Sequence, residues 1–178
     1  GEAHEVASRG AAILAGDALQ TCAFSTLLKS DCSDAIKVSL MAFLSNATGS
    51  SGMCGGQQLD IDASQLKISL EDLQTLHAMK TGALIVASVQ MAAIIGEADA
   101  DAFAALTAFA QDLGLAFQIQ DDILDVESTT ETLGKSAGKD AAQEKSTYPA
   151  RIGIDASKAL VNTLVERMRS NLPPFGER

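Results

Sequence analysis

Four polar residues in the second half of the chain have the types and the spacing to bind a cation. Gln118, Asp121, Asp122 and Asp125 fall on one stripe of a helix that turns about 100° per residue. Carboxylates within one turn repel each other, and a divalent cation such as Mg²⁺ offsets that repulsion by binding their oxygens. We therefore predict that the three aspartates are metal ligands. The alternative is a solvated acidic turn at a helix start.

Apolar residues border this acidic stripe on both sides. One flank consists of Leu106, Leu113, Phe117 and Leu124, and the other of Ile119, Ile123 and Val126. A solvated charged face would have more polar neighbours. We therefore expect the carboxylates to point into a cavity.

A lysine lies within an apolar helical pattern earlier in the chain. Lys80 is followed by Thr81 and stands between Leu76 and Leu84. Extension of the ammonium group to the surface is the usual outcome for such a lysine. The alternative is that Lys80 binds a phosphate, with the Thr81 hydroxyl as a second polar group. We interpret His77 as a surface histidine or one whose hydrogen bonds are satisfied.

Three further lysines lie in the polar segment that follows the aspartates. Lys135, Lys139 and Lys145 are spaced along residues 128–148. A long polar segment in a compact domain is usually functional or disordered. The lysines could close over a metal–phosphate cluster as point charges, or they could belong to a solvated loop. Both interpretations remain open on composition alone.

The elements that position these residues are expected to be helices. The chain has 178 residues, 47% of them hydrophobic, with three prolines and no tryptophan, which favours a single all-α domain over residues 1–178. Helical patterns cover 5–28, 35–47, 70–91, 102–127 and 155–170. The most apolar run, 82–96, is too short to span a bilayer and is predicted to be a buried core helix.

Charge and cysteine content narrow the functional classes. The net charge is −10 without a basic cluster, which argues against a nucleic-acid or anionic membrane partner. Cys22, Cys32 and Cys54 are odd in number and lack CxxC spacing, as expected of reduced thiols in the cytoplasm. Asp17 is interpreted either as an exposed acid or as a buried polar residue near a site.

Glycines are concentrated between the second and third helical patterns. Residues 49–56 contain Gly49, Gly52, Gly55 and Gly56, which lower helix stability by roughly 1 kcal/mol each relative to Ala. The segment lacks the lysine of a phosphate-binding GxxxxGK[ST] loop. We predict close helix packing here rather than direct contact with a ligand.

Six blocks in the chain resemble the short-chain trans-prenyl diphosphate synthase family, most closely its bacterial farnesyl diphosphate synthases. These blocks are 12–20, 52–57, 80–84, 117–125, 133–135 and 145–149. The resemblance implies an all-α isoprenoid-synthase helical bundle and a homodimer. It also implies a prenyltransferase that joins isopentenyl diphosphate to an allylic diphosphate, dimethylallyl or geranyl, with Mg²⁺ or Mn²⁺, to give farnesyl diphosphate or a similar short product.

The resemblance also assigns roles to single residues. Asp121, Asp122 and Asp125 match the family's second aspartate-rich motif, which holds Mg²⁺ on the allylic diphosphate. Lys80, Lys135 and Lys145 match residues that contact the diphosphate or close over it, and Thr81 and Gln118 match polar residues at the reaction centre. The expected catalytic residues are Lys80, Thr81 and Gln118. The chemistry agrees, because cations stabilise the charge that develops on leaving diphosphate.

One part of the family pattern has no counterpart in this sequence. The first aspartate-rich motif and its paired arginines should precede the Gly16-Asp17-Ala18-Leu19 segment, and residues 1–10 contain no DDxxD. We therefore expect a bundle that is incomplete at its N-terminus, inactive alone and prone to self-association.

Three alternatives to a synthase follow. They are a non-catalytic partner subunit, a terpene cyclase of the same fold and a ferritin-like di-metal bundle. The sequence lacks the Glu-x-x-His pairs of the last class.

Overall fold

The computed structural model describes residues 2–63, 69–133 and 147–172, with side chains described for 8–63, 69–128 and 147–172. Within these ranges the ordered elements are all helical, so the predicted all-α fold is confirmed. The elements are α1 (Glu2–Leu28), α2 (Asp34–Thr48), α3 (Met53–Ala63), α4 (Leu70–His77), the π-helical turn η1 (Ala78–Gly82), α5 (Ala83–Ile95), α6 (Ala100–Leu133), α8 (Tyr148–Ile152) and α9 (Ile154–Ser170).

Side-chain caps fix where several of these helices begin. Ser69 and Asp72 form a capping box at the start of α4: the Asp72 N–H donates to Ser69 Oγ at 3.0 Å, and the Ser69 N–H donates to Asp72 Oδ2 at 3.3 Å. Ser33 at the start of α2 and Thr147 at the start of α8 each accept one backbone N–H, without the reciprocal bond of a capping box. The predicted helical range that begins at residue 70 is confirmed at its start.

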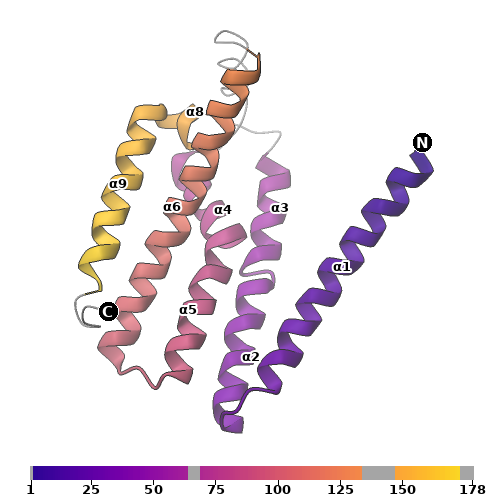
Figure 1. Cartoon of the computed structure of the whole chain (residues 1–178), viewed down its shortest axis with the longest axis vertical. Helices are drawn as coiled ribbons and strands as arrows, with labels where there is room; N and C mark the ends of the chain where they lie inside the picture. The colour runs from indigo at the N-terminus through magenta and orange to yellow at the C-terminus, as the bar shows by residue number, and fades with distance from the viewer. Residues whose placement is uncertain (1, 64–68, 134–146, 173–178) are drawn as a thin grey trace.

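The long helix α6 lies at the centre of the bundle, between α5 and α9 (Figure 1). On the other side of α5 comes α2, and α3 packs against η1. A buried apolar cluster joins α4, α6, α8 and α9, and its members are Leu73, Ala116, Ile119, Ile123, Tyr148, Leu164 and Met168. The aspartate-bearing part of α6 is held by this cluster.

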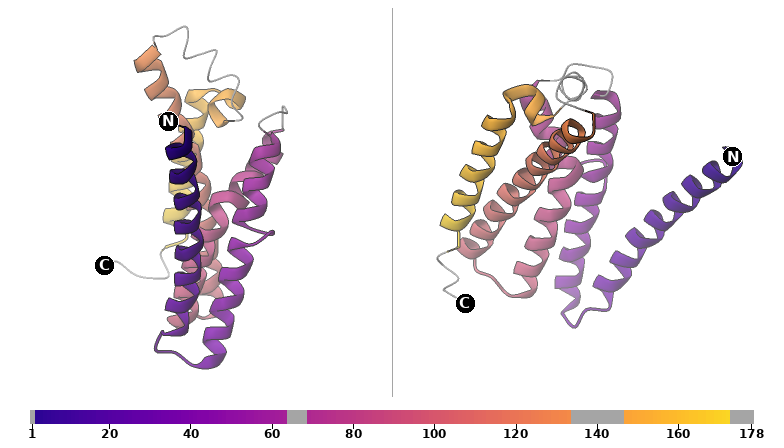
Figure 2. Two further views of the ribbon diagram at one scale, coloured as in Figure 1. Left: turned by 90° about the vertical axis from the view of Figure 1, so that its right-hand side faces the viewer. Right: turned by 45° about the horizontal axis from the view of Figure 1, so that its top comes forward.

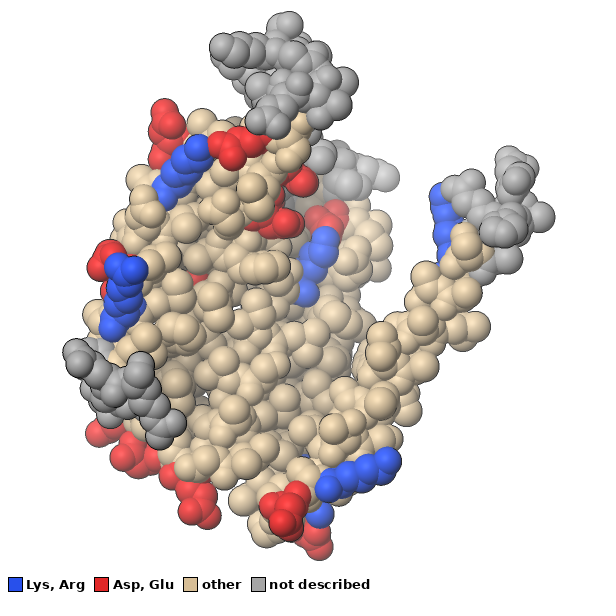
Figure 3. All heavy atoms as spheres, viewed as in Figure 1, with Lys and Arg blue, Asp and Glu red and all other residues tan. Residues whose placement is uncertain are grey.

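Helix α1 diverges from the bundle and approaches it only near the α1–α2 connection (Figure 2). Its large apolar side chains are exposed, among them Ile13 (66%), Leu14 (69%) and Leu19 (71%). Most of the visible face of α1 shows no charge (Figure 3), although Asp17 in the middle of the helix is exposed. This apolar helix therefore has no packing partner among the described residues along most of its length.

Three helical stretches are long and apolar enough, by length and composition, to cross a membrane: Ser8–Leu28, Leu70–Ile95 and Ala100–Ser128. The run at 82–96, predicted to be too short for this, belongs to the second stretch because α4, η1 and α5 follow one another without a break. The run is also less buried than predicted: Ala87 and Ala93 are buried, but Ile95 is exposed.

Glycines allow η1 to approach two neighbouring helices. A Cβ on Gly56 of α3 would overlap the backbone nitrogen of Lys80 and lie 2.7 Å from its Cα. A Cβ on Gly114 of α6 would lie 3.1 Å from the Cα of Gly82. The predicted close helix packing is thus confirmed for Gly56, which packs directly against the turn that carries Lys80, whereas Gly49 and Gly52 face backbone atoms of residues 45–47 at the end of α2.

Replacing Gly56 with Ala should lower the free energy of unfolding by about 1–3 kcal/mol, because the added methyl group forces η1 away from α3. Urea denaturation followed by helical circular dichroism measures this effect. The matched control is Gly16→Ala on α1, where a Cβ meets nothing within 4 Å. That variant should be as stable as the parent or more so. Equal stability of the two variants would show that η1 does not depend on this contact.

His77 is buried, contrary to the sequence interpretation. It is 8% exposed, and its two ring nitrogens have no hydrogen-bond partner among the described residues. Its ring stacks on that of Tyr148 with centroids 5.7 Å apart and planes inclined by 22°. Burial lowers the pKa of His77 to about 4; Asp60 opposes this shift and Lys80 adds to it. The residue is therefore a neutral aromatic member of the core at pH 7.

This shift predicts acid sensitivity. As pH falls from 6.5 to about 4, the unfolded chain binds a proton at His77 that the folded chain does not. The free energy of unfolding should drop by up to about 3 kcal/mol over that window. His77→Phe keeps the aromatic contact and should reduce the drop, as measured by urea midpoints at neutral and acidic pH. Burial raises the pKa of Asp122, so protonation of this carboxyl stabilises the folded chain as pH falls, which is opposite to the effect of His77. The difference between the parent and His77→Phe therefore reports on the histidine.

Candidate active site

The predicted site residues Lys80 and Thr81 lie on η1, the π-helical turn between α4 and α5. A π-helical turn inserts a residue into an α-helix and is frequent at functional sites. Gly56 and Gly114 bring α3 and α6 against this turn from two directions. Lys80 and Thr81 therefore contact residues on two different helices.

The Lys80 ammonium group pairs with a carboxylate on α3. Its Nζ lies 2.5 Å from Asp60 Oδ2, and the two side chains are 35% and 42% exposed. Lys80 is therefore held within the bundle by an ion pair instead of extending freely into solvent. Sequence reasoning missed Asp60. The sequence feature that could have identified Asp60 is its position one helical turn after Gly56, because this spacing puts both residues on the face of α3 that meets η1.

Thr81 belongs to a hydrogen-bonded relay that ends at the aspartate motif. Its hydroxyl donates to Gln118 Oε1 at 3.2 Å, and Gln118 Nε2 donates to Asp122 Oδ1 at 3.2 Å. The second Asp122 oxygen accepts the Tyr148 backbone N–H at 3.0 Å. His77 Nε2 lies 3.8 Å from the same oxygen. Thr81, which sequence reasoning selected apart from Gln118 and Asp122, is thus connected to both.

The three aspartates differ in their surroundings. Asp121 and Asp125 are exposed, whereas Asp122 is 7% exposed and burial raises its pKa. The expected cavity with apolar residues on both sides is therefore only half correct. Ile119 and Ile123 are buried, but Leu113, Phe117 and Leu124 are 37%, 58% and 51% exposed. That flank of α6 has no helix packed over it among the described residues.

Two of the carboxylates suit a hard divalent cation. Asp121 and Asp125 are four residues apart on one side of α6, and Mg²⁺ typically takes one or two carboxylates together with water and phosphate oxygens. Within the described ranges, no three His, Cys, Asp or Glu side chains form a ready-made metal site. The donor set therefore fits a cation that is shared with a phosphate ligand. The metal role of all three aspartates remains a prediction.

Several sequence-selected residues lie elsewhere. Lys135, Lys139 and Lys145 are outside the described residues, so their roles stay predictions. Asp17 is exposed on α1, as the surface interpretation proposed.

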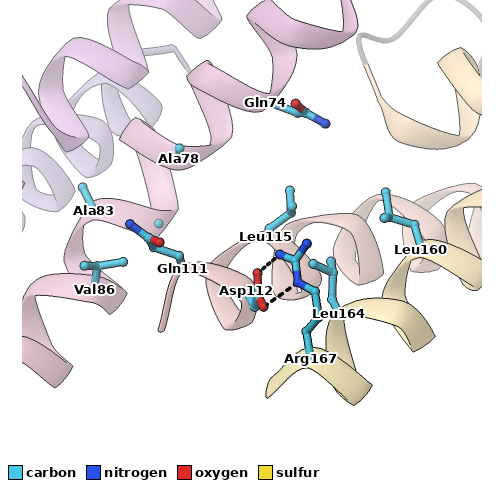
Figure 4. Close-up of a pocket in the computed structure, with 11 residues that line it drawn as sticks. Gln74, Ala78, Ala83, Val86, Gln111, Asp112, Leu115, Leu160, Leu164 and Arg167 are labelled. Carbon is cyan, nitrogen blue, oxygen red and sulfur yellow. Dashed lines mark hydrogen bonds and ion pairs between the residues drawn. The ribbon is translucent and has the colours of Figure 1, made fainter. Parts of the chain in front are cut away.

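A separate pocket of about 660 Å³ opens between the continuous helical stretch α4–η1–α5 and the packed helices α6 and α9 (Figure 4). It is lined mostly by apolar residues, by Gln74 and Gln111, and by an ion pair in which Arg167 Nε donates to Asp112 Oδ2 at 2.9 Å. Lys80, Thr81, Gln118 and the three motif aspartates do not line it. The pocket is therefore distinct from the relay, although Gly82 of η1 borders it.

Known proteins resemble this chain over most of its length. The family model described as polyprenyl synthetase matches residues 2–172. Farnesyl diphosphate synthase of Escherichia coli (strain K12) is 45% identical over 171 residues, which cover 94% of this chain and 57% of the relative. Farnesyl diphosphate synthase of Micrococcus luteus is 43% identical over 159 residues, 89% of this chain and 55% of the relative. The chain thus spans about half the length of the curated relatives it matches.

Solved structures show the same fold. A farnesyl/geranylfarnesyl diphosphate synthase from Zymomonas mobilis superposes with a TM-score of 0.78 at 33% identity, covering 94% of this chain and 55% of that one. Geranyltransferase from Helicobacter pylori, complexed with magnesium and isoprenyl diphosphate, gives a TM-score of 0.76 at 35% identity over 92% and 54%. From its family-model match, its relatives and its fold, the chain belongs to the polyprenyl synthetase family.

Proposed function

We propose that these residues form the part of a prenyl diphosphate synthase that holds the allylic diphosphate and triggers its ionisation. The supporting observation is the contact network itself: Thr81, next to Lys80 on η1, is linked through Gln118 to Asp122 of the aspartate motif. Chain elongation follows when the allylic cation, formed by release of diphosphate, bonds to the double bond of isopentenyl diphosphate and the resulting cation loses a proton. The product is farnesyl diphosphate or another short prenyl diphosphate.

Each side chain has a distinct task in this proposal. Lys80 contributes a positive charge to the diphosphate, and its Asp60 partner fixes where that charge lies. Asp121 and Asp125 hold Mg²⁺, with Mn²⁺ as a substitute. The metal supplies Lewis-acid stabilisation of the leaving diphosphate. Thr81 and Gln118 present polar atoms to the reacting carbon, while the apolar flank of α6 contributes a wall that excludes water.

The partners follow from the same proposal. The substrates are isopentenyl diphosphate and an allylic diphosphate, and the protein acts in the cytoplasm without a membrane span or a nucleic-acid partner. The exposed apolar face of α1, with Ile13, Leu14 and Leu19, favours association with a second copy as a homodimer.

A chimera tests the proposed reaction. Residues 2–172 would replace the matching segment of the E. coli relative, which supplies the remainder of a full-length chain. Incorporation of radiolabelled isopentenyl diphosphate into an acid-labile, prenylated product should occur at a rate near that of the E. coli parent. A folded chimera that binds both diphosphates without forming product would favour the non-catalytic partner subunit, and cyclised hydrocarbon would favour the terpene cyclase.

Lys80→Ala in the chimera should raise KM for the allylic diphosphate by about tenfold or more, because a charge-assisted contact worth about 1.5–3 kcal/mol is lost. Steady-state kinetics with the allylic substrate varied measure the change. The matched control is Lys158→Ala, which also removes a lysine from an ion pair, here 2.6 Å from Glu127 and far along the chain from η1. An unchanged KM for Lys80→Ala would show that this ammonium group does not bind substrate.

Asp121→Ala should lower kcat by several orders of magnitude while the helical signal persists, because the side chain is exposed and its loss removes metal binding without disturbing the core. Asp101→Ala, an exposed aspartate near the start of the same helix, is the control and should keep the parent kcat. Exhaustive chelation should abolish turnover, and added Mg²⁺ or Mn²⁺ should restore it. Metal-independent turnover would refute the role assigned to Asp121.

A further inference from the structure

Asp122 differs from the two aspartates around it. It is 7% exposed, whereas Asp121 and Asp125 are exposed on the same helix. Both of its oxygens accept hydrogen bonds from protein donors, the Tyr148 backbone N–H and the Gln118 amide. A buried carboxylate is stable only when such donors compensate for its lost hydration. The hydrogen bonds to Asp122 therefore fix the orientation of the Gln118 amide and the position of the Tyr148 backbone N–H.

The carboxylate sets the direction of the relay. An ionised carboxylate only accepts hydrogen bonds, so the Gln118 amide must turn its Nε2 toward Asp122. Gln118 Oε1 then faces Thr81, whose hydroxyl must donate to it. The Thr81 proton is therefore committed to the relay, and its oxygen lone pairs are left to face other groups. The lone pairs of the Thr81 oxygen carry partial negative charge, which attracts a cation at the reacting carbon.

The same carboxylate joins three elements. Asp122 and Gln118 are on α6, Thr81 is on η1, and Tyr148 is the first residue of α8. Tyr148 is fully buried and stacks on His77 at the end of α4. Movement of Asp122 out of this position would break two hydrogen bonds and remove the acceptor of the first backbone N–H of α8.

We propose that Asp122 is a positioning residue that orients Gln118 and Thr81 and anchors α8, and that Asp121 and Asp125 hold the metal without it. The proposal rests on the proposed function for what the oriented groups do. Two parts of the proposal can be tested without that function: that Asp122 anchors α8, and that Asp122 does not bind the metal.

The anchoring has a direct optical readout. Tyr148 is the only tyrosine and the chain has no tryptophan, so the intrinsic fluorescence of the 178-residue chain comes from this side chain. Asp122→Ala should expose Tyr148 to an added quencher, because its backbone N–H loses its acceptor. Asp122→Asn should restore protection, because the Asn oxygen still accepts that bond and its NH₂ group can donate to a flipped Gln118 amide. Asp121→Asn, the neighbouring control, should leave quenching unchanged.

Metal binding is measured on the same chains by the electron paramagnetic resonance of Mn²⁺ with inorganic diphosphate. Asp121→Asn should weaken Mn²⁺ binding by about tenfold or more, whereas Asp122→Asn should leave it at the parent value. In the active chimera, Asp122→Asn should lower kcat with an unchanged Mg²⁺ requirement. The reason is that a flipped Gln118 amide reverses the relay and engages the Thr81 lone pairs. A role confined to packing would leave kcat at the parent value in this variant.

The results of these experiments distinguish the positioning role of Asp122 from a metal-ligand role and from the proposed function. Equal losses of Mn²⁺ affinity in Asp121→Asn and Asp122→Asn would make Asp122 a ligand and overturn the proposal. Parent-like quenching in Asp122→Ala would also overturn it, since α8 would then not depend on this carboxylate. Failure of the chimera to form product, with the quenching and Mn²⁺ results as expected, would refute the proposed function and leave the anchoring role standing.

Discussion

The arrangement of this site depends on how closely η1 approaches its neighbours. Gly56 on α3 leaves room for backbone atoms where any side chain would collide, and a Cβ on Gly114 of α6 would be in tight contact with Gly82. The turn is therefore fixed by direct backbone packing from two sides, and such contacts have little freedom to adjust. Lys80 meets Asp60, and Thr81 meets Gln118, only because the turn lies this close. The polar network is a consequence of the glycines.

Burial of polar groups is the cost of that geometry. Asp122 and His77 are removed from water within 3.8 Å of each other, and burial shifts the pKa of each toward its neutral form. The carboxylate is compensated by two donors, while the imidazole has no hydrogen-bond partner among the described residues and stacks on Tyr148. Asp122 is next to the exposed Asp121 in the chain, and polar groups buried with incomplete hydrogen bonding are often found at functional sites.

Sequence reasoning recovered five helical stretches and most of the polar residues that the structure brings together, but it missed α3 and α8 and ended α6 at residue 127 instead of Leu133. The glycines at the start of α3 and the serine and threonines at 128–130 are weak helix formers, so no local pattern marked these helical residues. Helical periodicity and the Ser69 capping box are local signals, and Lys80, Thr81 and Gln118 stood out as polar residues within apolar patterns. Asp60 did not stand out, because its partner is twenty residues away and no local pattern records that pairing. The exposure of Phe117 is likewise invisible locally, since it depends on which helices lie over α6.

The divergence of α1 has a consequence for how the chain unfolds. Because α1 packs mainly against α2 near one end, most of its backbone hydrogen bonds are protected by helix formation alone and not by the core. Isolated helices are marginal in water, so α1 should fray and re-form many times while α6 stays closed. The chain then consists of two cooperative units. Amide hydrogens of α1 would exchange with solvent orders of magnitude sooner than those around Ile119 and Ile123.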